Sequence, residues 1–366
     1  MADRAGAVDR SFWRGRRVFL TGHTGFKGSW LTLWLDALGA KVTGYALEPP
    51  TSPSLYEQAG VAPVRSITAD IRDFARLAAA IAETRPEVVI HMAAQSVVKR
   101  GYADPIETYS ANVMGTVNVF EAVRGLGERC TVVNVTSDKC YAHRDSGPPY
   151  REDDPMGGDD PYSNSKGCAE LVTTSYRQSF FPPAELETHG VALASARAGN
   201  AIGGGDWTPD QLIPDLVRGF TAAKPCLIRS PKAIRPWQFV LEPLRGYLML
   251  AERLTTDGQS FATGWNFGPV ETDAKPVEWI ADRLTKAWGD GAAWVLDKAA
   301  HPAEAAVLRL DASKAAKCLG WRPALPLDRG LDWIADWYRG WKRGEDLGRL
   351  TRGQIARYHE LTEGTS

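Results

Sequence analysis

Apolar and polar positions follow two different periods along the first half of the chain. Short, continuously apolar runs rich in β-branched residues predict strands at 17–20, 41–46, 66–69, 88–92, 131–135 and 191–196. Between them, stretches such as 30–38, 74–83 and 112–123 carry an apolar residue every three or four positions and predict amphipathic helices. Apolar strands that alternate with helices indicate a parallel sheet covered on both faces. We therefore expect an α/β fold with a doubly wound parallel sheet.

The pattern changes after about residue 200, where glycines and prolines mark a loop-rich region with short helices at 213–221 and 243–254. We expect residues 1–12 to be a disordered tail and residues 13–200 to form the sheet domain. A further strand should return to the sheet from within 234–270. Residues 201–366 should mainly form a smaller lobe and the C-terminal helices.

Three tryptophans near the C-terminus recur at every fourth position: Trp333, Trp337 and Trp341. This spacing places the three indoles on one face of a helix. Aromatic stripes are usually core, so we expect the helix to dock on its own domain. A surface for a partner protein is the alternative interpretation.

Composition and charge narrow the class of protein. The chain has 366 residues and a formal net charge of −1. Because it carries no block of basic residues, nucleic acid is not expected as a partner. No apolar run is long enough to span a bilayer, and the first ten residues lack the apolar core of a signal peptide.

The number and spacing of the cysteines indicate the cellular compartment in which we expect the protein. The chain has five cysteines, an odd number, and none of their spacings matches a zinc site. They are most simply free thiols, and together with the polar N-terminus they lead us to expect a cytoplasmic protein without a metal. The five are Cys130, Cys140, Cys168, Cys226 and Cys318.

A glycine-rich turn follows the first predicted strand and opens the first long helix. Gly22 allows the tight turn, Gly25 lets the backbone approach a pyrophosphate, and Gly28 lets the helix pack against the sheet. The helix N-terminus then presents N–H groups to the phosphates. This context predicts a dinucleotide site of the Rossmann type, to which Thr24, Phe26 and Lys27 of the same turn also belong.

Other cofactor contacts should come from the ends of neighbouring strands. Asp70 and Ile71 close the third strand, where they can reach the adenine, and Ala93, Ala94 and Gln95 follow the fourth. After the second strand, Ala46 stands where an acidic residue would bind the adenosine ribose, and Glu48 is displaced by two positions. This feature leaves NAD and NADP open, but no arginine stands beside the glycines to meet a 2′-phosphate. We therefore prefer NAD.

A second motif supplies acid–base chemistry. Tyr162 and Lys166 lie four residues apart and would share one face of a helix that points into the cleft. Tyrosine is a poor base at neutral pH, and a nearby ammonium group would lower its pKa. Ser137, at the end of the fifth strand, would offer its hydroxyl to the same substrate oxygen. The glycines, this serine and the Tyr/Lys pair in this order indicate a nicotinamide-dependent enzyme that acts on an alcohol carbon.

From residue 16 to residue 323 the chain resembles the extended short-chain dehydrogenases/reductases, in the branch that modifies nucleotide sugars. Three further segments carry this resemblance: 197–200 (RAGN), 234–240 (IRPWQFV), and 310–314 (LDASK) with 319–323 (LGWRP). The segment 136–141 (TSDKCY) is similar to that of sugar-nucleotide 4,6-dehydratases, in which an acid and a base follow the hydroxyl residue. The Asp138–Lys139 pair, with residues 153–158, resembles the members of that branch that act on CDP-glucose.

The resemblance implies a mechanism in which NAD takes hydride from C4 of the hexose and returns it to C6. Tyr162 would take the O4 proton, Lys139 would remove the C5 proton, and Asp138 would protonate the C6 hydroxyl so that water leaves. The product would be CDP-4-keto-6-deoxy-D-glucose, a deoxyhexose precursor of O-antigens. Lysine is mostly protonated at neutral pH, so we hypothesise a competent state with neutral Lys139 and protonated Asp138. The alternative is an ordinary ion pair between them. A homodimer is also implied.

Four residues are candidates for holding the substrate: Ser96, Asn200, Arg235 and His301. The guanidinium of Arg235 suits the diphosphate, and its neighbours Trp237 and Phe239 indicate a buried strand. Asn200 can bind a phosphate or sugar oxygen. The resemblance places His301 on a loop near the nucleotide, although an ordinary surface histidine is equally expected.

Two other functions remain open. One is a 4-epimerase or 4-reductase that uses the same Tyr/Lys pair without elimination, but such an enzyme needs no acid and base after Ser137. The other is a dinucleotide-sensing binding protein without catalysis, which would be expected to lack Tyr162 or Lys166. Release of one water from the substrate distinguishes a dehydratase from both.

Overall fold

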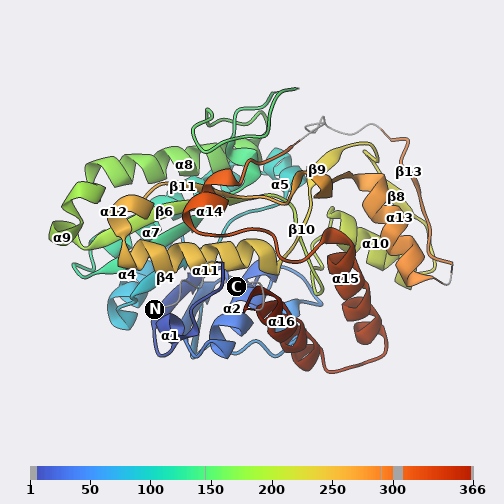
Figure 1. Cartoon of the computed structure of the whole chain (residues 1–366), viewed down its shortest axis with the longest axis horizontal. Helices are drawn as coiled ribbons and strands as arrows, with labels where there is room; N and C mark the ends of the chain where they lie inside the picture. Colours follow the sequence, from blue (N-terminus) through green and yellow to red (C-terminus); the bar gives the residue numbers. More distant parts are fainter. Residues whose placement is uncertain (1–5, 145, 290, 300–307, 364–366) are drawn as a thin grey trace.

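A seven-stranded parallel sheet forms the centre of the molecule (Figure 1), in the spatial order β3-β2-β1-β4-β5-β6-β11. The computed structural model describes residues 6–144, 146–289, 291–299 and 308–363. The order reverses between β1 and β4, which is where ligands bind in doubly wound sheets. The predicted α/β class is confirmed. The strands are β1 (Arg17–Thr21), β2 (Lys41–Ala46), β3 (Arg65–Thr68), β4 (Val88–His91), β5 (Cys130–Val135), β6 (Val191–Ala198) and β11 (Gly264–Phe267).

Helices cover both faces of the sheet because successive strand residues point to opposite sides. On β1, Val18 and Leu20 join one apolar cluster, and Phe19 joins the other. The first cluster includes α11, which crosses in front of the strands in Figure 1, and α2 with α16 beside it. The second includes α4 and α7. The helices that lie on or next to the sheet are α2 (Phe26–Ala37), α4 (Phe74–Thr84), α5 (Val98–Ala103), α6 (Pro105–Tyr109), the π-helical turn η1 (Ser110–Met114), α7 (Gly115–Arg124), α8 (Pro161–Ser179) and α11 (Leu241–Thr256).

The last strand of the sheet comes from the second half of the chain. β11 pairs in parallel with β6, with Gly264 opposite Ser195. The expected returning strand is therefore confirmed, although Ile234–Pro236 (β9) lies in a separate two-stranded sheet with β12. Since one chain segment crosses back into the sheet, residue 200 as a domain boundary stays a prediction.

The remaining elements form the smaller lobe and the edges of the molecule. They are α1 (Arg10–Trp13), α3 (Leu55–Gln58), η2 (Asp138–Cys140), η3 (Pro183–Glu185), α9 (Leu186–His189), β7 (Ala201–Ile202), α10 (Leu212–Thr221), β8 (Cys226–Ile228), β9 (Ile234–Pro236), β10 (Gln238–Phe239), α12 (Gly258–Phe261), η4 (Glu271–Asp273), β12 (Ala274–Pro276), α13 (Val277–Trp288), β13 (Trp294–Leu296), α14 (Ser313–Cys318), α15 (Leu327–Lys342) and α16 (Leu347–Glu363). No helix among the described residues is long and apolar enough to cross a membrane.

Part of the expected N-terminal tail is ordered, which corrects the prediction for residues 6–12. Val8 is buried, and Asp9 caps α1 by accepting hydrogen bonds from the N–H groups of Ser11 and Phe12. The indole of Trp13 donates to Glu252 on α11 at 2.6 Å. A tryptophan and a capping aspartate thus anchor a segment whose polar composition alone indicates disorder.

The tryptophan stripe on α15 packs inside the molecule. Trp333 meets Phe239 edge to face at 5.6 Å, and Trp341 lies 4.7 Å from Trp207. Trp337 is fully buried and fills the space beside Gly204, where a Cβ atom would lie 2.1 Å from the indole. The prediction that this helix docks on its own domain is confirmed.

Candidate active site

Two glycines of the turn after β1 are required by the packing of the protein itself. Gly22 has a φ of +79°, and a Cβ there would lie 2.8 Å from the backbone nitrogen of Ala93. A Cβ on Gly28 would lie 2.0 Å from the carbonyl oxygen of Gly22. Any larger residue at either position would push the turn away from β4 or from α2.

Gly25 differs, because a Cβ atom there would meet only one atom of the described residues, at ordinary contact distance. Its φ is −75°, and its Cβ would come no closer than 3.4 Å to the carbonyl oxygen of Gly22. It is the N-cap of the twelve-residue α2 and offers no side chain to the first-turn N–H groups. Open space and unsatisfied donors at a helix N-terminus fit a pyrophosphate. The geometry at Gly25 is compatible with the dinucleotide prediction, and the cofactor contacts of Gly25, Thr24 and Phe26 stay predictions.

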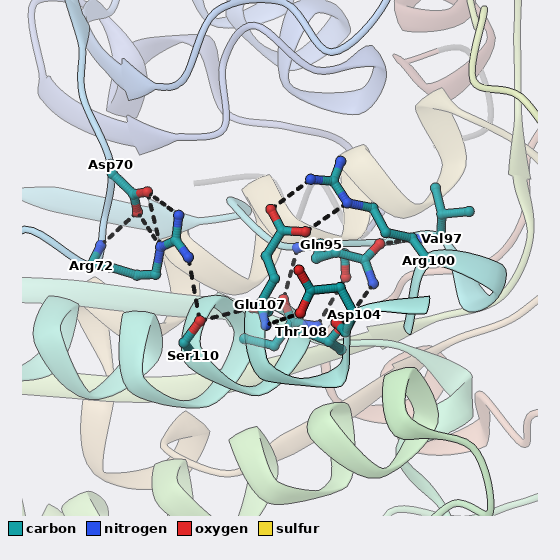
Figure 2. A network of polar contacts seen from close by, with 10 residues as sticks. Asp70, Arg72, Gln95, Val97, Arg100, Asp104, Glu107, Thr108 and Ser110 are labelled. Carbon is teal, nitrogen blue, oxygen red and sulfur yellow. Dashed lines mark hydrogen bonds and ion pairs between the residues drawn. The ribbon is translucent and has the colours of Figure 1, made fainter. Parts of the chain in front are cut away.

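The ends of β3 and β4 carry the other predicted cofactor residues. Asp70 is held by Arg72 through both carboxylate oxygens, at 2.5 and 3.0 Å (Figure 2), and this pairing lowers the pKa of Asp70. Ile71 is buried. Arg72 would therefore compete with adenine for the carboxylate of Asp70, and the predicted contact of Asp70 with adenine stays a prediction.

Gln95 fixes the loop that follows β4. Its backbone N–H donates to Asn112 at 2.8 Å. Its side-chain amide donates to Thr108 at 2.9 Å (Figure 2). Its side-chain oxygen accepts from the N–H of Val97 at 2.6 Å. The side chain thus holds the loop in place, while Ala93 and Ala94 are half-buried and the adjacent Ser96 is exposed.

Asn112 connects this loop to the catalytic helix. It lies in the π-helical turn η1, a local irregularity that often occurs at functional sites. Its amide donates to the Gln95 carbonyl and to Ser165, both at 2.9 Å, and Ser165 donates to the Tyr162 carbonyl at 2.6 Å. Sequence analysis missed this residue. A buried asparagine within an apolar helical pattern was the available signal.

The start of α8 places the Tyr/Lys pair. Asp160 caps the helix by accepting from the N–H of Ser163 at 3.0 Å, and Pro161 occupies the first helical position. Tyr162 therefore lies in the first turn, with Lys166 one turn later, and both side chains are buried. Lys139 approaches from the side, with its amine 5.9 Å from the centre of the Tyr162 ring.

The acid and base candidates lie on a short turn after β5. Ser137 caps the turn η2, accepts from the N–H of Lys139 at 3.2 Å, and donates to one oxygen of Asp138 at 3.0 Å. The other carboxylate oxygen of Asp138 is buried without a hydrogen-bond partner. The turn η2 packs against α8, which carries Tyr162 and Lys166. The fold thus brings together all five predicted catalytic residues.

Burial shifts the acidities of these groups. It raises the pKa of Asp138, against the opposing charge of Lys139, which agrees with a proton donor. It also raises the pKa of Tyr162, and the lowering influence of Ser137 opposes this only in part. The predicted lowering of the Tyr162 pKa by Lys166 is not found, because desolvation outweighs every other influence on the phenol.

Lys27 reaches away from the turn on which it lies. Its amine donates to the hydroxyl of Tyr247 on α11 at 3.0 Å. Burial lowers the pKa of Lys27 to about 8, an effect that the charge of Asp138 opposes. Burial and the charge of Lys27 together lower the pKa of Lys166 to about 8. Lys27 therefore belongs electrostatically with the catalytic groups, and its predicted cofactor contact stays a prediction.

The predicted substrate residues lie mainly at the start of the smaller lobe. Arg235 on β9 is buried, as are Trp237 and Phe239, which confirms the predicted buried strand. The charge of Arg235 acts to lower the pKa of Asp138, although burial of that carboxyl prevails. Asn200 is half-buried, and its carbonyl accepts from the N–H of Gln238 at 3.0 Å. His301 lies outside the described residues.

A buried ion pair between α8 and β6 stabilises the catalytic turn 137–140. We call it the Glu170 network: Glu170 on α8 accepts from Arg197 at 2.8 Å, from Thr136 at 2.5 Å and from Ser195 at 2.7 Å. Arg197 also donates to the hydroxyl of Tyr141 at 2.8 Å. Since Thr136 and Tyr141 flank the residues 137–140, the network fixes both ends of that turn. Sequence analysis did not find it, because its members are far apart in the chain.

Metal chemistry has no evident site in the described ranges. Within them, no three histidine, cysteine or acidic side chains are placed to hold an ion together.

Comparisons with known proteins agree with this geometry. The family model described as GDP-mannose 4,6 dehydratase matches residues 19–333. The chain is 55% identical to CDP-glucose 4,6-dehydratase of Salmonella typhimurium over 356 residues, which is 97% of this chain and 99% of the relative. It is 26% identical to dTDP-glucose 4,6-dehydratase of Neisseria gonorrhoeae, over 72% of this chain and 77% of that one.

Solved structures share the fold. The UDP-glucose 4-epimerase of Thermus thermophilus in complex with NAD superposes with a TM-score of 0.75 at 24% identity, covering 88% of this chain and 99% of that one. The dTDP-glucose 4,6-dehydratase of Bacillus anthracis in complex with NAD gives a TM-score of 0.73 at 20% identity, covering 92% and 100%. The resemblance that rested on Tyr162, Lys166 and the turn after β5 is confirmed. The chain belongs to the GDP-mannose 4,6 dehydratase family.

Proposed function

We propose that this protein is an NAD-dependent enzyme that converts CDP-D-glucose to CDP-4-keto-6-deoxy-D-glucose and water, a step toward deoxyhexose precursors. The observation that carries the proposal is the turn after β5, which brings Asp138 and Lys139 beside Tyr162. An epimerase or reductase needs Tyr162 but has no use for this acid and base. The choice of CDP-glucose is supported by the relative that is 55% identical over almost the whole chain.

Each catalytic residue has one task in this proposal. Tyr162 takes the proton of the C4 hydroxyl, with Ser137 bonded to the same oxygen. Lys139 removes the C5 proton once C4 is a ketone, and Asp138 protonates the departing C6 hydroxyl. Asp138 suits this task because burial raises its pKa and leaves one of its oxygens unpartnered.

NAD, when bound, would accept hydride from C4 and return it to C6. Gly22, Thr24, Gly25, Phe26 and Gly28 would hold its pyrophosphate, and Lys166 its nicotinamide ribose. The predicted contacts of Lys27, Asp70, Ile71, Ala93, Ala94 and Gln95 belong to the same proposal.

The substrate would lie between β9 and the catalytic turn. We assign the diphosphate of the substrate to Arg235, whose guanidinium suits phosphate. The charge of Arg235 acts on the pKa of Asp138, which supports a position close to the catalytic turn. Asn200 and Ser96 complete the proposed contacts, together with His301.

The test is incubation of the purified protein and NAD with CDP-, dTDP-, UDP- and GDP-hexoses, followed by mass spectrometry. We expect loss of one water from CDP-glucose. A product of unchanged mass would indicate an epimerase. No product from any of the four would favour a binding protein.

We further propose that two copies pair through the helices next to the active site. Large apolar side chains stand exposed on α6, η1 and α8: Ile106, Tyr109, Met114 and Leu171. Ile106 and Leu171 are 82% and 59% exposed, and α6 packs against α8, so the side chains extend over one helical surface. A dimer by light scattering that becomes a monomer in Ile106→Asp would support this arrangement, whereas a wild-type monomer would refute it.

A cytoplasmic location is part of the proposal. All five cysteines are free thiols, and three of them are buried. Reduced thiols agree with a reducing compartment, where nucleotide sugars and NAD are also available. Fractionation of cells that produce the protein would test the location.

A further inference from the structure

His91 is a buried histidine at the end of β4, and the proposed mechanism gives it no task. Its two ring nitrogens contact hydroxyl groups on different elements. Nδ1 lies 2.7 Å from Thr21 at the end of β1, and Nε2 lies 3.2 Å from Thr116 on α7. Thr21 directly precedes the glycine turn, and α7 directly follows the π-helical turn η1. One imidazole ring therefore joins the predicted cofactor site to the turn that carries Asn112.

The hydroxyl of Thr21 determines which nitrogen of His91 carries the hydrogen. Thr21 Oγ1 accepts hydrogen bonds from the backbone N–H groups of Met92 and Ala93, at 3.0 and 3.1 Å. A hydroxyl has one hydrogen and two acceptor positions, so the hydrogen of Thr21 is left for Nδ1 of His91. Nδ1 is then an acceptor and carries no hydrogen.

The hydroxyl of Thr116 leads to the same assignment from the other side of the ring. Thr116 Oγ1 donates its only hydrogen to the carbonyl oxygen of Asn112 at 2.7 Å. It can therefore meet Nε2 of His91 only as an acceptor, so Nε2 carries the hydrogen. A second proton on the ring would point at Thr21, whose two acceptor positions are already taken. Burial and the charge of Lys166 agree with a neutral ring, because they lower the pKa of His91 to about 3.

The Nδ1 side of the ring leads to the predicted cofactor site. The two N–H groups that Thr21 accepts belong to the first residues after β4. This loop touches the glycine turn, since a Cβ atom on Gly22 would lie 2.8 Å from the backbone nitrogen of Ala93. Gly22 and Ala93 are both proposed contacts of NAD. The bond from Thr21 to His91 thus orients a hydroxyl that holds these two segments together.

The Nε2 side leads to the catalytic helix. Thr116 bonds the carbonyl group of Asn112, whose side-chain amide donates to Ser165 on α8 at 2.9 Å. Ser165 donates in turn to the carbonyl oxygen of Tyr162 at 2.6 Å. Hydrogen bonds therefore connect His91 to the backbone of the residue whose phenol takes the O4 proton in the proposed mechanism.

We propose that His91 is a positioning residue with two separable tasks, and that it acts as the neutral tautomer with the hydrogen on Nε2. Through Nδ1 it orders the glycine turn and the loop after β4 for NAD binding. Through Nε2 it orders the π-helical turn and thereby the position of Tyr162 for proton transfer. The second task rests on the proposed function, whereas the first concerns NAD binding alone.

The test uses two amide replacements in the full-length protein. His91→Asn places an amide near the position of Nδ1, and His91→Gln places one near the position of Nε2, so each keeps one bond of the ring and loses the other. We expect His91→Asn to bind NAD within about twofold of the wild type but to lower kcat with CDP-glucose by about 10-fold. We expect His91→Gln to weaken NAD binding by about 10-fold and to keep kcat at saturating NAD within about threefold.

Two threonine variants complete the comparison. Thr116→Val removes the acceptor of Nε2 and should reproduce the effect of His91→Asn. Thr256→Val is the matched control and should change neither property, because Thr256 also bonds the carbonyl four residues before it but lies exposed on α11. Calorimetric titration with NAD and steady-state kinetics measure the two properties. Equal changes of NAD affinity and kcat in His91→Asn and His91→Gln would overturn the inference.

The wild-type protein supplies a criterion that no folding defect of a variant can obscure. NMR of protein labelled with ¹⁵N in its histidines shows at neutral pH which ring nitrogen carries the hydrogen. We expect it on Nε2 of His91, and a hydrogen on Nδ1 would overturn the inference. If the wild type releases no water from CDP-glucose, the proposed function has failed. The tautomer and the NAD affinities of the two amide variants then still decide whether His91 positions the cofactor site.

Discussion

Two groups of buried charges lie side by side in this molecule and behave in opposite ways. In the Glu170 network, every oxygen of Glu170 has a donor, and its pKa is lowered because Arg197, Thr136 and Ser195 stabilise the charged form. In the active site, Lys166 is buried and Lys27 is half-buried, and neither has a carboxylate partner among the described residues. Burial lowers the pKa of both amines to about 8, so they are poised to lose their charge.

The difference separates support from chemistry. A buried ion pair that is fully hydrogen-bonded resists any change of protonation, which suits a scaffold. Buried groups without such partners have shifted acidities and can exchange protons near neutral pH, which suits catalysis. The turn 137–140 lies between the two groups. The Glu170 network fixes its position, and the turn itself contributes Ser137, Asp138 and Lys139 to the active site.

The largest effect should follow removal of the phenol from the catalytic group. Tyr162→Phe should lower kcat by about 10²- to 10⁴-fold, because the O4 proton loses its acceptor. The melting temperature should stay close to that of the wild type, since the buried ring remains. Steady-state kinetics and thermal unfolding check this, and a variant with nearly full activity would remove Tyr162 from the mechanism.

Removal of the proposed C5 base should be almost as severe but selective. Lys139→Met should still oxidise C4, so reduced cofactor should accumulate and absorb, while water loss should fall by about 10²- to 10⁴-fold. Lys286→Met, at an exposed position on α13, is the matched control. Elimination that survives with C4 oxidation intact would reduce Lys139 to an ion-pair partner of Asp138.

Breaking the ion pair of the Glu170 network should lower the stability of the fold and leave the catalytic groups in place. Arg197→Leu leaves the Glu170 carboxylate buried without its cation, which costs about 3–5 kcal/mol in the free energy of unfolding. Arg309→Leu removes an exposed pair with Glu271 and should cost about 0–1 kcal/mol. Urea denaturation measures both. Equal losses in the two variants would contradict the assigned role of the Glu170 network.

A smaller effect is expected in the glycine turn, where one glycine should matter for NAD binding and another for the stability of the fold. Gly25→Ala should fold normally, because its methyl group meets only the Gly22 carbonyl at 3.4 Å, but it should bind NAD more weakly. Gly28→Ala should destabilise the fold, because its methyl group would collide with the same carbonyl at 2.0 Å. Calorimetric titration with NAD and thermal unfolding distinguish the two. Unchanged NAD affinity in Gly25→Ala would contradict the proposal that the pyrophosphate of NAD lies beside Gly25.

The smallest effect concerns pH. Because the pKa of Lys27 and Lys166 is about 8 in the folded protein and about 10.4 in an unfolded chain, the unfolded state binds more protons above pH 8. Their contribution to stability should therefore rise with pH between 8 and 9.5. Urea denaturation across this range should show a weaker rise in Lys27→Met than in Lys286→Met. Identical slopes would mean that Lys27 is charged throughout.

The sequence was sufficient where structure depends on near neighbours. The glycine turn, the spacing of Tyr162 and Lys166, and the turn after β5 are local patterns, and the fold brings them together as predicted. The parallel order of the sheet followed from apolar strands that alternate with helices.

What could not be predicted depends on distant partners. Glu170 and Arg197 are 27 positions apart, and neither stands in a recognisable pattern with Ser195. The direction of Lys27 depends on Tyr247, 220 positions away. The raised pKa of Tyr162 reflects the depth of its burial, which a spacing of four residues does not reveal.

The position of β11 at the margin of the sheet has a consequence for biosynthesis. During translation, β1 to β6 leave the ribosome long before residues 264–267, so the backbone of β6 has an open edge on the nascent chain. A fragment that stops near residue 200 would keep that edge permanently and would be prone to aggregate. The sheet that carries the catalytic turn is thus completed only after more than two-thirds of the polypeptide has been made.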